Sequence, residues 1–188
     1  MPDPVTLHGP RVTLRPWRLP DDLDPLFTIN GDPEAMRFFL NTHDRSESDA
    51  WGRRIAAAFG DRGYGFWVVE LPAEGMVGVV GLQPVFFDAS FTPATEIGWR
   101  IGTRFQRRGL AEEAARIALA HGFGPAGLDR VVAFTPPANE PSWRLMEKLG
   151  MRRVTTFEHP RVPPGHPYRQ HLLYEIARAG WIDGRLRA

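Results

Sequence analysis

Apolar residues recur along this chain with two periods, that of a strand and that of a helix. Val12–Arg15 alternates apolar and polar side chains, as a short strand does. Asp21 and Asp22 then provide a helix start, because acidic residues favour the first turn, and apolar residues follow at helical spacing up to Ile29. Further along, helical and strand patterns alternate, which predicts one α/β (α+β) domain spanning residues 1–188.

Two more helices are expected before the next strand. One begins at Asp32 and leads into Met36, Phe38 and Phe39, and the other contains Trp51 and Phe59. Ser46 or Ser48 is expected to cap that second helix, and Gly60 and Gly63 to end it. The later expected elements are strands at 64–71 and 76–87 joined by a turn at 72–75, a loop at 88–93, a strand at 95–101, a helix at 110–123, a strand at 130–135, a helix at 139–149 ended by Gly150, and strands at 152–157 and 171–177.

Composition narrows the class of protein. The chain has 188 residues with 43% hydrophobic and 24% charged, which is ordinary for a soluble globular protein. Twenty-three basic and 22 acidic residues argue against stable nucleic-acid binding. Cysteine is absent, which excludes thiolate catalysis and thiolate metal sites and is compatible with a cytoplasmic protein. We find no apolar run that would span a membrane.

The stretch from Glu96 to Ala111, EIGWRIGTRFQRRGLA, carries the most chemical information. A strand leads into a loop with Arg107, Arg108 and Gly109, and the loop opens a helix. Free N–H groups at a helix start favour a phosphate, although an ordinary solvated basic turn has the same pattern. Neither common nucleotide fingerprint with several glycines is present.

Three ordered motifs resemble one family, the GCN5-related N-acetyltransferases (GNAT). The segment from Gln106 to Ala111, QRRGLA, matches the [QR]-x-x-G-x-[GA] loop of that family. Downstream, NEPSWRLMEKLGM at 139–151 resembles N-x-x-S-x-x-L-x-E-K-L-G-F, a form typical of the branch with ribosomal-protein N-terminal acetyltransferases. The opening RVTLRPW and the terminal LLYEI look like that branch's first and last strands, so the resemblance covers about residues 11–178.

The resemblance implies a fold and a cofactor site. The fold is a mixed, mostly antiparallel sheet of six to seven strands, splayed between the fourth and fifth strands and flanked by about four helices. Acetyl-CoA would lie in the splay as co-substrate, with no metal. The residues implied to bind it are Trp99, Arg100 and Ile101 for the pantetheine arm, the backbone of Arg107, Arg108, Gly109, Leu110 and Ala111 for the pyrophosphate, Gln106 at the start of the same loop, and Asn139 and Ser142 near the arm and the sulfur.

Two residues are the candidates for catalysis in a direct attack of an amine on the thioester. Glu96 is the candidate base, or it pairs with Arg100 on the same strand face. Ser142 is the candidate proton donor to the thiolate, since Met146 occupies the position of the family's usual tyrosine; the alternative is a local backbone hydrogen bond from Ser142. Asn139 binds coenzyme A, caps its helix, or does both.

Other residues have simpler interpretations. Tyr174 is expected in the packing of a strand, and Trp51, Phe38, Phe39 and Phe59 in the core. His159 and His166 flank a proline-rich loop, which is expected to be solvated rather than metal-binding and to form a wall of the acceptor site. The other expected wall is the early helical region. Its arginines at 37, 45, 53 and 54 either attract an acidic acceptor or form a solvated helix face.

The sequence therefore predicts an acetyl-CoA-dependent N-acetyltransferase acting on a primary amine. The acceptor expected from the branch resemblance is a protein N-terminus, such as that of a ribosomal protein, and the alternative is a small amine such as an amino acid, a polyamine or an antibiotic. A large acceptor needs an open site, whereas a small amine is more often enclosed. Two further alternatives are a non-catalytic acyl-CoA sensor and a longer acyl donor, and the chain is expected to be a monomer or a homodimer.

Overall fold

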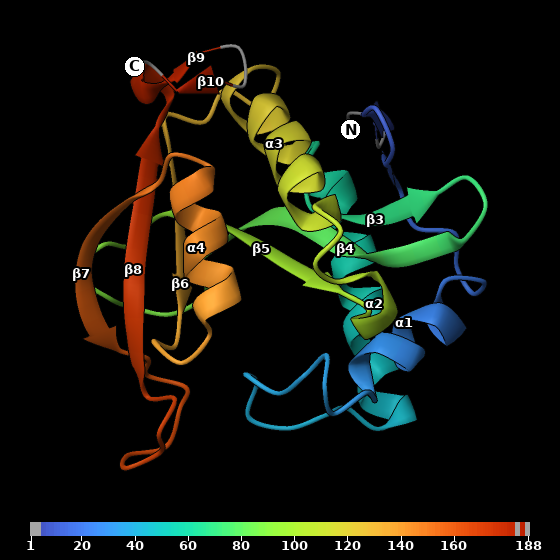
Figure 1. Ribbon diagram of the computed structural model, residues 1–188, viewed down its shortest axis with the longest axis horizontal. Coiled ribbons are helices and arrows are strands. Elements are labelled where there is room, and N and C mark those ends of the chain that lie inside the picture. The colour runs from blue at the N-terminus through green and yellow to red at the C-terminus, as the bar shows by residue number, and fades with distance from the viewer. Residues whose placement is uncertain (1–4, 183–184, 187–188) are drawn as a thin grey trace.

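The computed structural model describes residues 5–182 and 185–186, and one large sheet organises it. Eight strands follow the order β1-β2-β3-β4-β5-β6-β8-β7, and a separate two-stranded sheet pairs β9 with β10 (Figure 1). The large sheet is antiparallel except between β5 and β6. The strands are β1 Leu7–His8, β2 Thr13–Arg15, β3 Phe66–Leu71, β4 Gly75–Pro84, β5 Thr95–Ile101, β6 Arg130–Thr135, β7 Arg152–Glu158, β8 Gln170–Ala177, β9 Trp181–Ile182 and β10 Arg185–Leu186.

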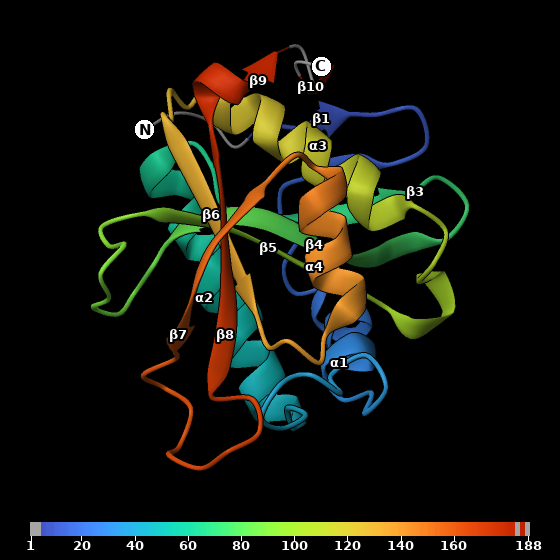
Figure 2. The same ribbon diagram turned by 60° about the vertical axis from the view of Figure 1, so that its left-hand side comes forward.

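Four α-helices cover the two faces of this sheet. They are α1 Leu23–Asn30, α2 Arg45–Arg62, α3 Leu110–Phe123 and α4 Glu140–Lys148, with short 3₁₀ turns at Thr103–Phe105 and Arg178–Gly180. Side chains of α3 and α4 share one core with the sheet, and side chains of α1 and α2 share a second core on the opposite face. Figure 2 shows α4 in front of the strands and α2 behind them. None of the helices in the described part of the chain is both long and apolar enough to cross a membrane.

Most expected elements are confirmed, and several have the expected bounds. The strands at 95–101 and 130–135 and the helix at 110–123 match residue for residue. The sheet has eight strands rather than six or seven, because the two-residue strand β1 pairs with β2. The fourth strand of the family pattern is therefore β5 and the fifth is β6. The strand expected at 76–87 ends at Pro84, where the chain leaves the sheet.

The helix expected after Asp32 is wrong. Residues 33–38 form turns, although Asp32 does accept a hydrogen bond from the Glu34 backbone N–H. The apolar side chains of this segment pack in different directions: Met36 is buried, Phe38 contacts Tyr168, and Phe39 lies against Arg100 and is 43% exposed. A helix would place these three side chains on one apolar face, where they could not reach three separate partners. Tertiary contacts therefore determine the conformation of residues 33–38. Phe39 is also not part of the core.

The caps of α2 also differ from the expectation. Asp44 is the N-cap, and it forms a capping box with Glu47. Ser48 lies inside the helix and accepts a hydrogen bond from Asn30, in a buried contact. The helix continues past Gly60 and ends at Gly63, whose φ of 71° is a left-handed conformation that glycine adopts without strain. These contacts hold α2 against α1, on the face of the sheet that carries Glu96.

Candidate active site

Strands β5 and β6 run in parallel and separate after two pairs of residues. Thr95 pairs with Val131 and Glu96 with Val132, and no later pair joins these strands in the described chain. The other edge of β5 stays paired with β4 along its whole length. In Figure 1, β6, β7, β8 and α4 lie on one side of the separation and β3, β4, α1 and α2 on the other. The edge of β5 that faces β6 therefore has unpaired backbone groups on alternate residues beyond Glu96, in the segment that contains the predicted Trp99, Arg100 and Ile101.

The loop between β5 and α3 presents a run of free backbone donors. Arg107 and Gly109 have positive φ angles of 60° and 77°, an alternation that turns successive N–H groups toward one concave surface. Within the described residues, the backbone N–H groups from Arg107 to Glu112 make no hydrogen bond. Since α3 begins at Leu110, its dipole adds partial positive charge there. The geometry suits a phosphate or pyrophosphate.

Side-chain contacts hold this loop in place. The Gln106 side chain donates to the Ile101 carbonyl at 3.0 Å, so it fastens the loop to β5. Arg11 donates to the Arg108 carbonyl at 2.9 Å and forms an ion pair with Glu113 in the first turn of α3 at 2.7 Å. Arg11 thereby balances an acidic side chain beside the predicted phosphate site. Leu110 is buried in the core and contributes to the loop through its backbone alone.

Asn139 and Ser142 lie across the separation, at the start of α4. Asn139 occupies the N-cap position of α4, but its side chain does not cap the helix. Its carbonyl accepts from the backbone of Ser142 at 3.1 Å. In the described chain, neither the Asn139 amide nor the Ser142 hydroxyl makes a hydrogen bond of its own, so both side chains are free to meet a ligand. Met146 is buried in the core.

Glu96 is a half-buried carboxyl on the face of β5 opposite α3. Gln83 of β4 donates to its carboxylate at 2.6 Å. Burial raises the pKa of Glu96 to about 7, against the lowering that the Gln83 hydrogen bond and the charge of Arg161 produce. Since Glu96 makes no ion pair within the described residues, its carboxylate is free to take a proton near neutral pH.

The expected alternative, an ion pair between Glu96 and Arg100, is wrong. Arg100 lies on the same face but donates through Nη1 to Asn30, and its guanidinium contacts the rings of Phe39 and Trp51 at 4.4 and 4.8 Å from their centroids. Burial lowers the pKa of Arg100 to about 10. Glu96 and Arg100 are four residues apart, about 13 Å along a strand, and their side chains contact different partners.

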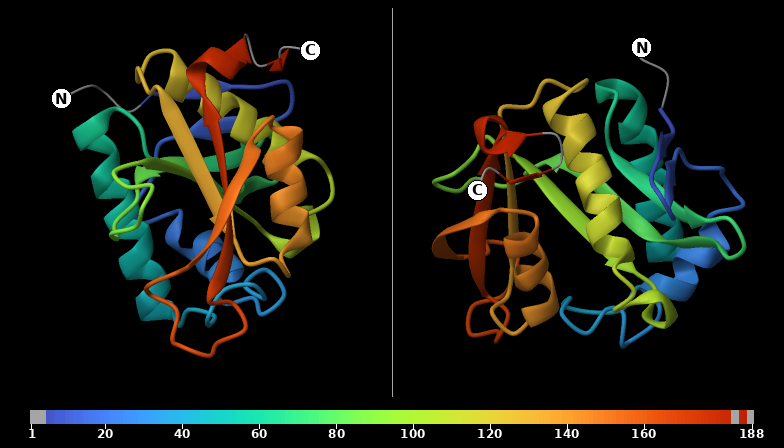
Figure 3. Two further views of the ribbon diagram at one scale, coloured as in Figure 1. Left: turned by 90° about the vertical axis from the view of Figure 1, so that its left-hand side faces the viewer. Right: turned by 45° about the horizontal axis from the view of Figure 1, so that its top comes forward.

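Three loops meet over the face of β5 that carries Glu96. They are the α1–α2 connection (residues 31–44), the β4–β5 loop (85–94) and the β7–β8 loop (159–169). Tyr168 donates to the Arg37 carbonyl at 3.1 Å, and its ring meets that of Phe38 with centroids 6.3 Å apart. Arg161 donates to the Phe86 carbonyl. The β7–β8 loop thus contacts the other two loops, as Figure 3 (left) shows for its approach to the α1–α2 connection.

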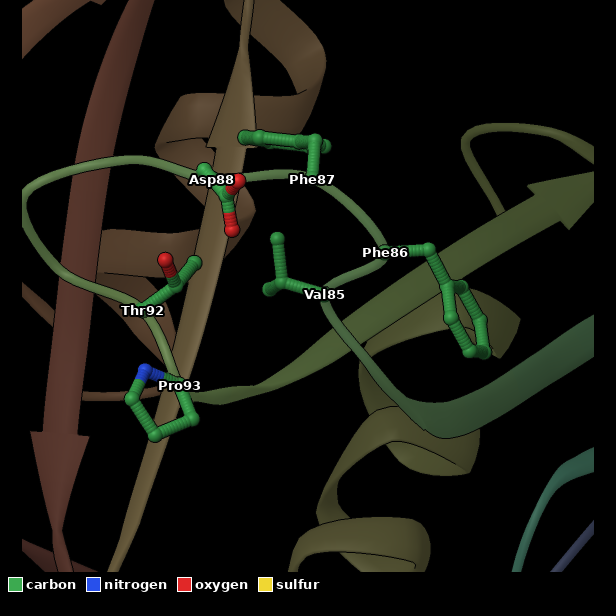
Figure 4. A pocket seen from close by; sticks show the side chains of 6 residues that line it. All are labelled: Val85, Phe86, Phe87, Asp88, Thr92 and Pro93. Carbon is green, nitrogen blue, oxygen red and sulfur yellow. The ribbon is translucent and has the colours of Figure 1, made fainter.

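The β4–β5 loop is held by an aromatic cluster on β6, β7 and the start of the β7–β8 loop. Phe87 and Phe91 pack against Phe134, Phe157 and His159. A pocket of about 400 Å³ lies in this loop, lined by Val85, Phe86, Phe87, Asp88, Thr92 and Pro93 (Figure 4). It includes none of the predicted site residues. The side chain of Phe86 points away from the other five and is 53% exposed.

The loop histidines differ from the expectation of a solvated loop. His159 packs in the aromatic cluster with its ring centroid 4.9 Å from that of His171 and the two rings tilted by 45°, and burial lowers the pKa of His159. His166 contacts Tyr168. In the part of the chain that the structure describes, no group of three His, Cys, Asp or Glu side chains is placed to hold a metal ion.

Several residues of this face were not predicted from the sequence. Gln83, Arg161 and Asn30 contact or face the predicted residues, but they come from three distant segments and carry no local motif. One available signal was the register of the β4–β5 hairpin, which sets Gln83 opposite Glu96. No sequence pattern brings Asn30 or Arg161 to β5.

The comparisons with known proteins agree with this geometry. A family model described as "Acetyltransferase (GNAT) domain" matches residues 11–152. The chain is 32% identical over 122 residues to "Uncharacterized N-acetyltransferase YnaD" of Bacillus subtilis (strain 168), covering 65% of this chain and 69% of that protein. It is 30% identical over 188 residues to the "FsC-acetyl coenzyme A-N(2)-transacetylase" of Aspergillus fumigatus, covering 94% and 78%.

Solved structures extend the comparison to the fold. A GNAT-family acetyltransferase from Bacillus anthracis superposes with a TM-score of 0.77 at 25% identity, covering 93% of this chain and 99% of that one. RimJ of Mycobacterium smegmatis, in complex with CoA-disulfide, superposes with a TM-score of 0.71 at 23% identity, covering 93% and 88%, and supports the fold alone. With a splayed sheet, a donor-rich loop and a family match over three quarters of its length, the chain belongs to the GNAT family and is an N-acetyltransferase.

Proposed function

We propose that this enzyme transfers an acetyl group from acetyl-CoA to a small primary amine. The observation that carries the choice of acceptor is the meeting of the three loops over Glu96. Tyr168 joins the β7–β8 loop to the α1–α2 connection, and Arg161 joins it to the β4–β5 loop, so the three loops border the acceptor face together. This arrangement favours a small amine over the protein N-terminus expected from the branch resemblance.

The relatives are compatible with this choice. The A. fumigatus relative is named for transacetylation at N(2) of FsC. The structures named for ribosomal-protein acetylation are 17% and 23% identical to this chain and support the fold alone. The small-amine proposal therefore depends mainly on the loops.

Acetyl-CoA would bind on the open edge of β5. The free N–H groups from Arg107 to Glu112 would hold its pyrophosphate, and the backbone of Trp99–Ile101 its pantetheine arm. Asn139 would donate to that arm from α4. The thioester carbonyl would accept a hydrogen bond from a free N–H of β5, which stabilises negative charge that develops on that oxygen.

The reaction would be a single displacement. The neutral amine nitrogen attacks the carbonyl carbon, a C–N bond forms, and the C–S bond breaks with its electron pair on sulfur. One amine proton passes to the Glu96 carboxylate, directly or through water, because a carboxyl with a pKa of about 7 is half ionised at neutral pH. The thiolate receives a proton from the Ser142 hydroxyl, which is replenished from solvent. The products are an N-acetyl amide and coenzyme A.

The test is a panel of amines in an assay of coenzyme A release. Small amines and peptides with free N-termini are compared at equal concentration, and thermal unfolding with acetyl-CoA, ATP or NAD checks donor binding separately. Saturating acetyl-CoA at one hundred times its Kd adds about 2.7 kcal/mol of stability. Faster release with small amines supports the proposal. Faster release with peptides, or binding of acetyl-CoA without any release, contradicts it.

A further inference from the structure

The loops over β5 bury a cation without an acidic partner. Arg100 makes no ion pair among the described residues, although the chain forms many ion pairs elsewhere. Its Nε is buried and has no hydrogen-bond partner. Removing a charge from water without a counter-ion is costly, so a native structure that keeps one there usually has a use for it.

A second unpaired group lies beside Arg100. Nδ1 of His43 and Nε of Arg100 are the two buried side-chain polar atoms without a partner in the described part of the chain. Asn30 connects them, since its side-chain oxygen accepts from Arg100 and its backbone carbonyl accepts from the His43 N–H at 2.9 Å. Burial lowers the pKa of His43, and the charge of Arg100 lowers it further.

The geometry of Arg100 leaves one edge of its guanidinium free. The rings of Phe39 and Trp51 lie against its face, and Nη1 donates to Asn30. The Nε–Nη2 edge has no acceptor within the described residues. That edge carries two parallel N–H donors, the arrangement that a carboxylate accepts in bidentate pairs, and because its Nε is buried the carboxylate has to displace the side chains that cover it.

We propose that the acceptor amine also carries a carboxylate, and that Arg100 binds that carboxylate while Glu96 takes the amine proton. This inference rests on the proposed function, because it concerns the same acceptor face. Glu96 and Arg100 are four residues apart on that face, about 13 Å along the strand, with Gly98 between them. An amino carboxylate reaches both residues in an extended form, or a water relays the amine proton to Glu96.

The surrounding charges agree with this assignment. The predicted arginines of the early helical region are engaged elsewhere or exposed: Arg37 pairs with Glu34, and Arg45 pairs with Asp24 and Asp49. Arg161 adds a positive charge near Glu96 at the other end of the face. A purely cationic acceptor, such as a polyamine, would meet two arginines and one carboxyl that is half neutral at pH 7.

The test compares each amino carboxylate with its own primary amide. The series contains glycine, β-alanine, 4-aminobutyrate and 6-aminohexanoate, with larger α-amino acids, and rates are corrected for the measured fraction of neutral amine. We expect kcat/KM to favour the carboxylate by roughly 10- to 100-fold, the usual size of a charged hydrogen bond. In Arg100→Gln the preference should fall to about one, while the KM for acetyl-CoA stays unchanged.

The controls separate a binding role from a structural one. Arg100→Lys keeps the charge and should keep part of the preference, and Arg53→Gln removes an exposed charge of α2 and should change nothing. A merely structural Arg100 would lower the rates of both members of a pair equally. That result, or equal rates for carboxylate and amide in the wild type, overturns the inference and leaves the proposed function intact. Absence of release with every amine overturns both.

Discussion

The two sides of β5 are built in different ways. On the edge that faces β6, the candidate donor site consists of backbone N–H groups from one continuous stretch, together with Asn139 and Ser142 of one helix turn. On the Glu96 face, the candidate acceptor site consists of side chains from distant segments, among them Gln83, Arg100 and Arg161. The first arrangement suits a donor shared by a whole family, and the second can change one loop at a time.

The largest effect on the acceptor side of β5 is expected at Glu96. Glu96→Gln should lower kcat/KM for the amine by a hundredfold or more, since general base catalysis contributes about 10²–10⁴. In the wild type, kcat/KM corrected for the fraction of neutral amine should rise with pH until about 7 as Glu96 ionises, and the variant should lose this limb. The measurement is the rate of coenzyme A release between pH 5.5 and 9.

Gln83→Leu provides the control for that profile. It removes a hydrogen bond that stabilises the charged carboxylate, so the limb should move to higher pH while the KM for acetyl-CoA stays constant. A pH profile that is identical in the wild type and Glu96→Gln would show that another group accepts the proton.

Glu96→Gln should also increase the free energy of unfolding above neutral pH. The pKa of Glu96 is raised in the folded protein, so the folded state binds more protons and loses stability as pH rises from about 4.5 to about 7. Glu96→Gln should therefore be about 1–3 kcal/mol more stable at pH 8, allowing for partial exposure, and equal to the wild type below pH 4. Urea unfolding at both pH values measures this. Asp21→Asn, at an exposed carboxylate, should show no comparable gain.

The donor side is tested at Gly109. Its φ of 77° disfavours a side chain, and an added Cβ would lie 3.3 Å from Nη2 of Arg11. Gly109→Ala should raise the KM for acetyl-CoA about tenfold, because a strain of about 1.4 kcal/mol changes an equilibrium tenfold. Gly75→Ala is the matched control, with a φ of 69° and open space around the Cβ. An equal effect from both variants would mean that backbone strain acts through global stability.

The smallest expected effect is at the contact between loops. Tyr168→Phe keeps the ring contact with Phe38 and removes the hydrogen bond to Arg37, so the KM of the amine should rise two- to threefold. The KM for acetyl-CoA should not change. Tyr174→Phe, which removes a hydrogen bond to Glu147 on α4, is the control and should leave the amine KM unchanged. A change confined to acetyl-CoA in Tyr168→Phe would contradict the assignment of the two sides.

The donor side of β5 was easier to predict from the sequence than the acceptor side. The donor loop was predictable because its signal is local: a strand, a glycine with positive φ and a helix start lie within sixteen residues. The turns after Asp32 and the partners of Arg100 were not, because Phe38, Phe39 and Asn30 take positions set by residues far away in the chain. The periodicity of that segment indicated a helix, and tertiary contacts overrode it.

The separation between the donor edge and the acceptor face of β5 also has a consequence for the order of events in a catalytic cycle. If the donor and the amine approach the strand from opposite sides, neither has to leave before the other arrives, and both are present when the acetyl group moves. Initial-rate plots would then show intersecting rather than parallel lines. Each product would depart from its own side of the strand, so the release of coenzyme A and that of the acetylated amine would be independent steps.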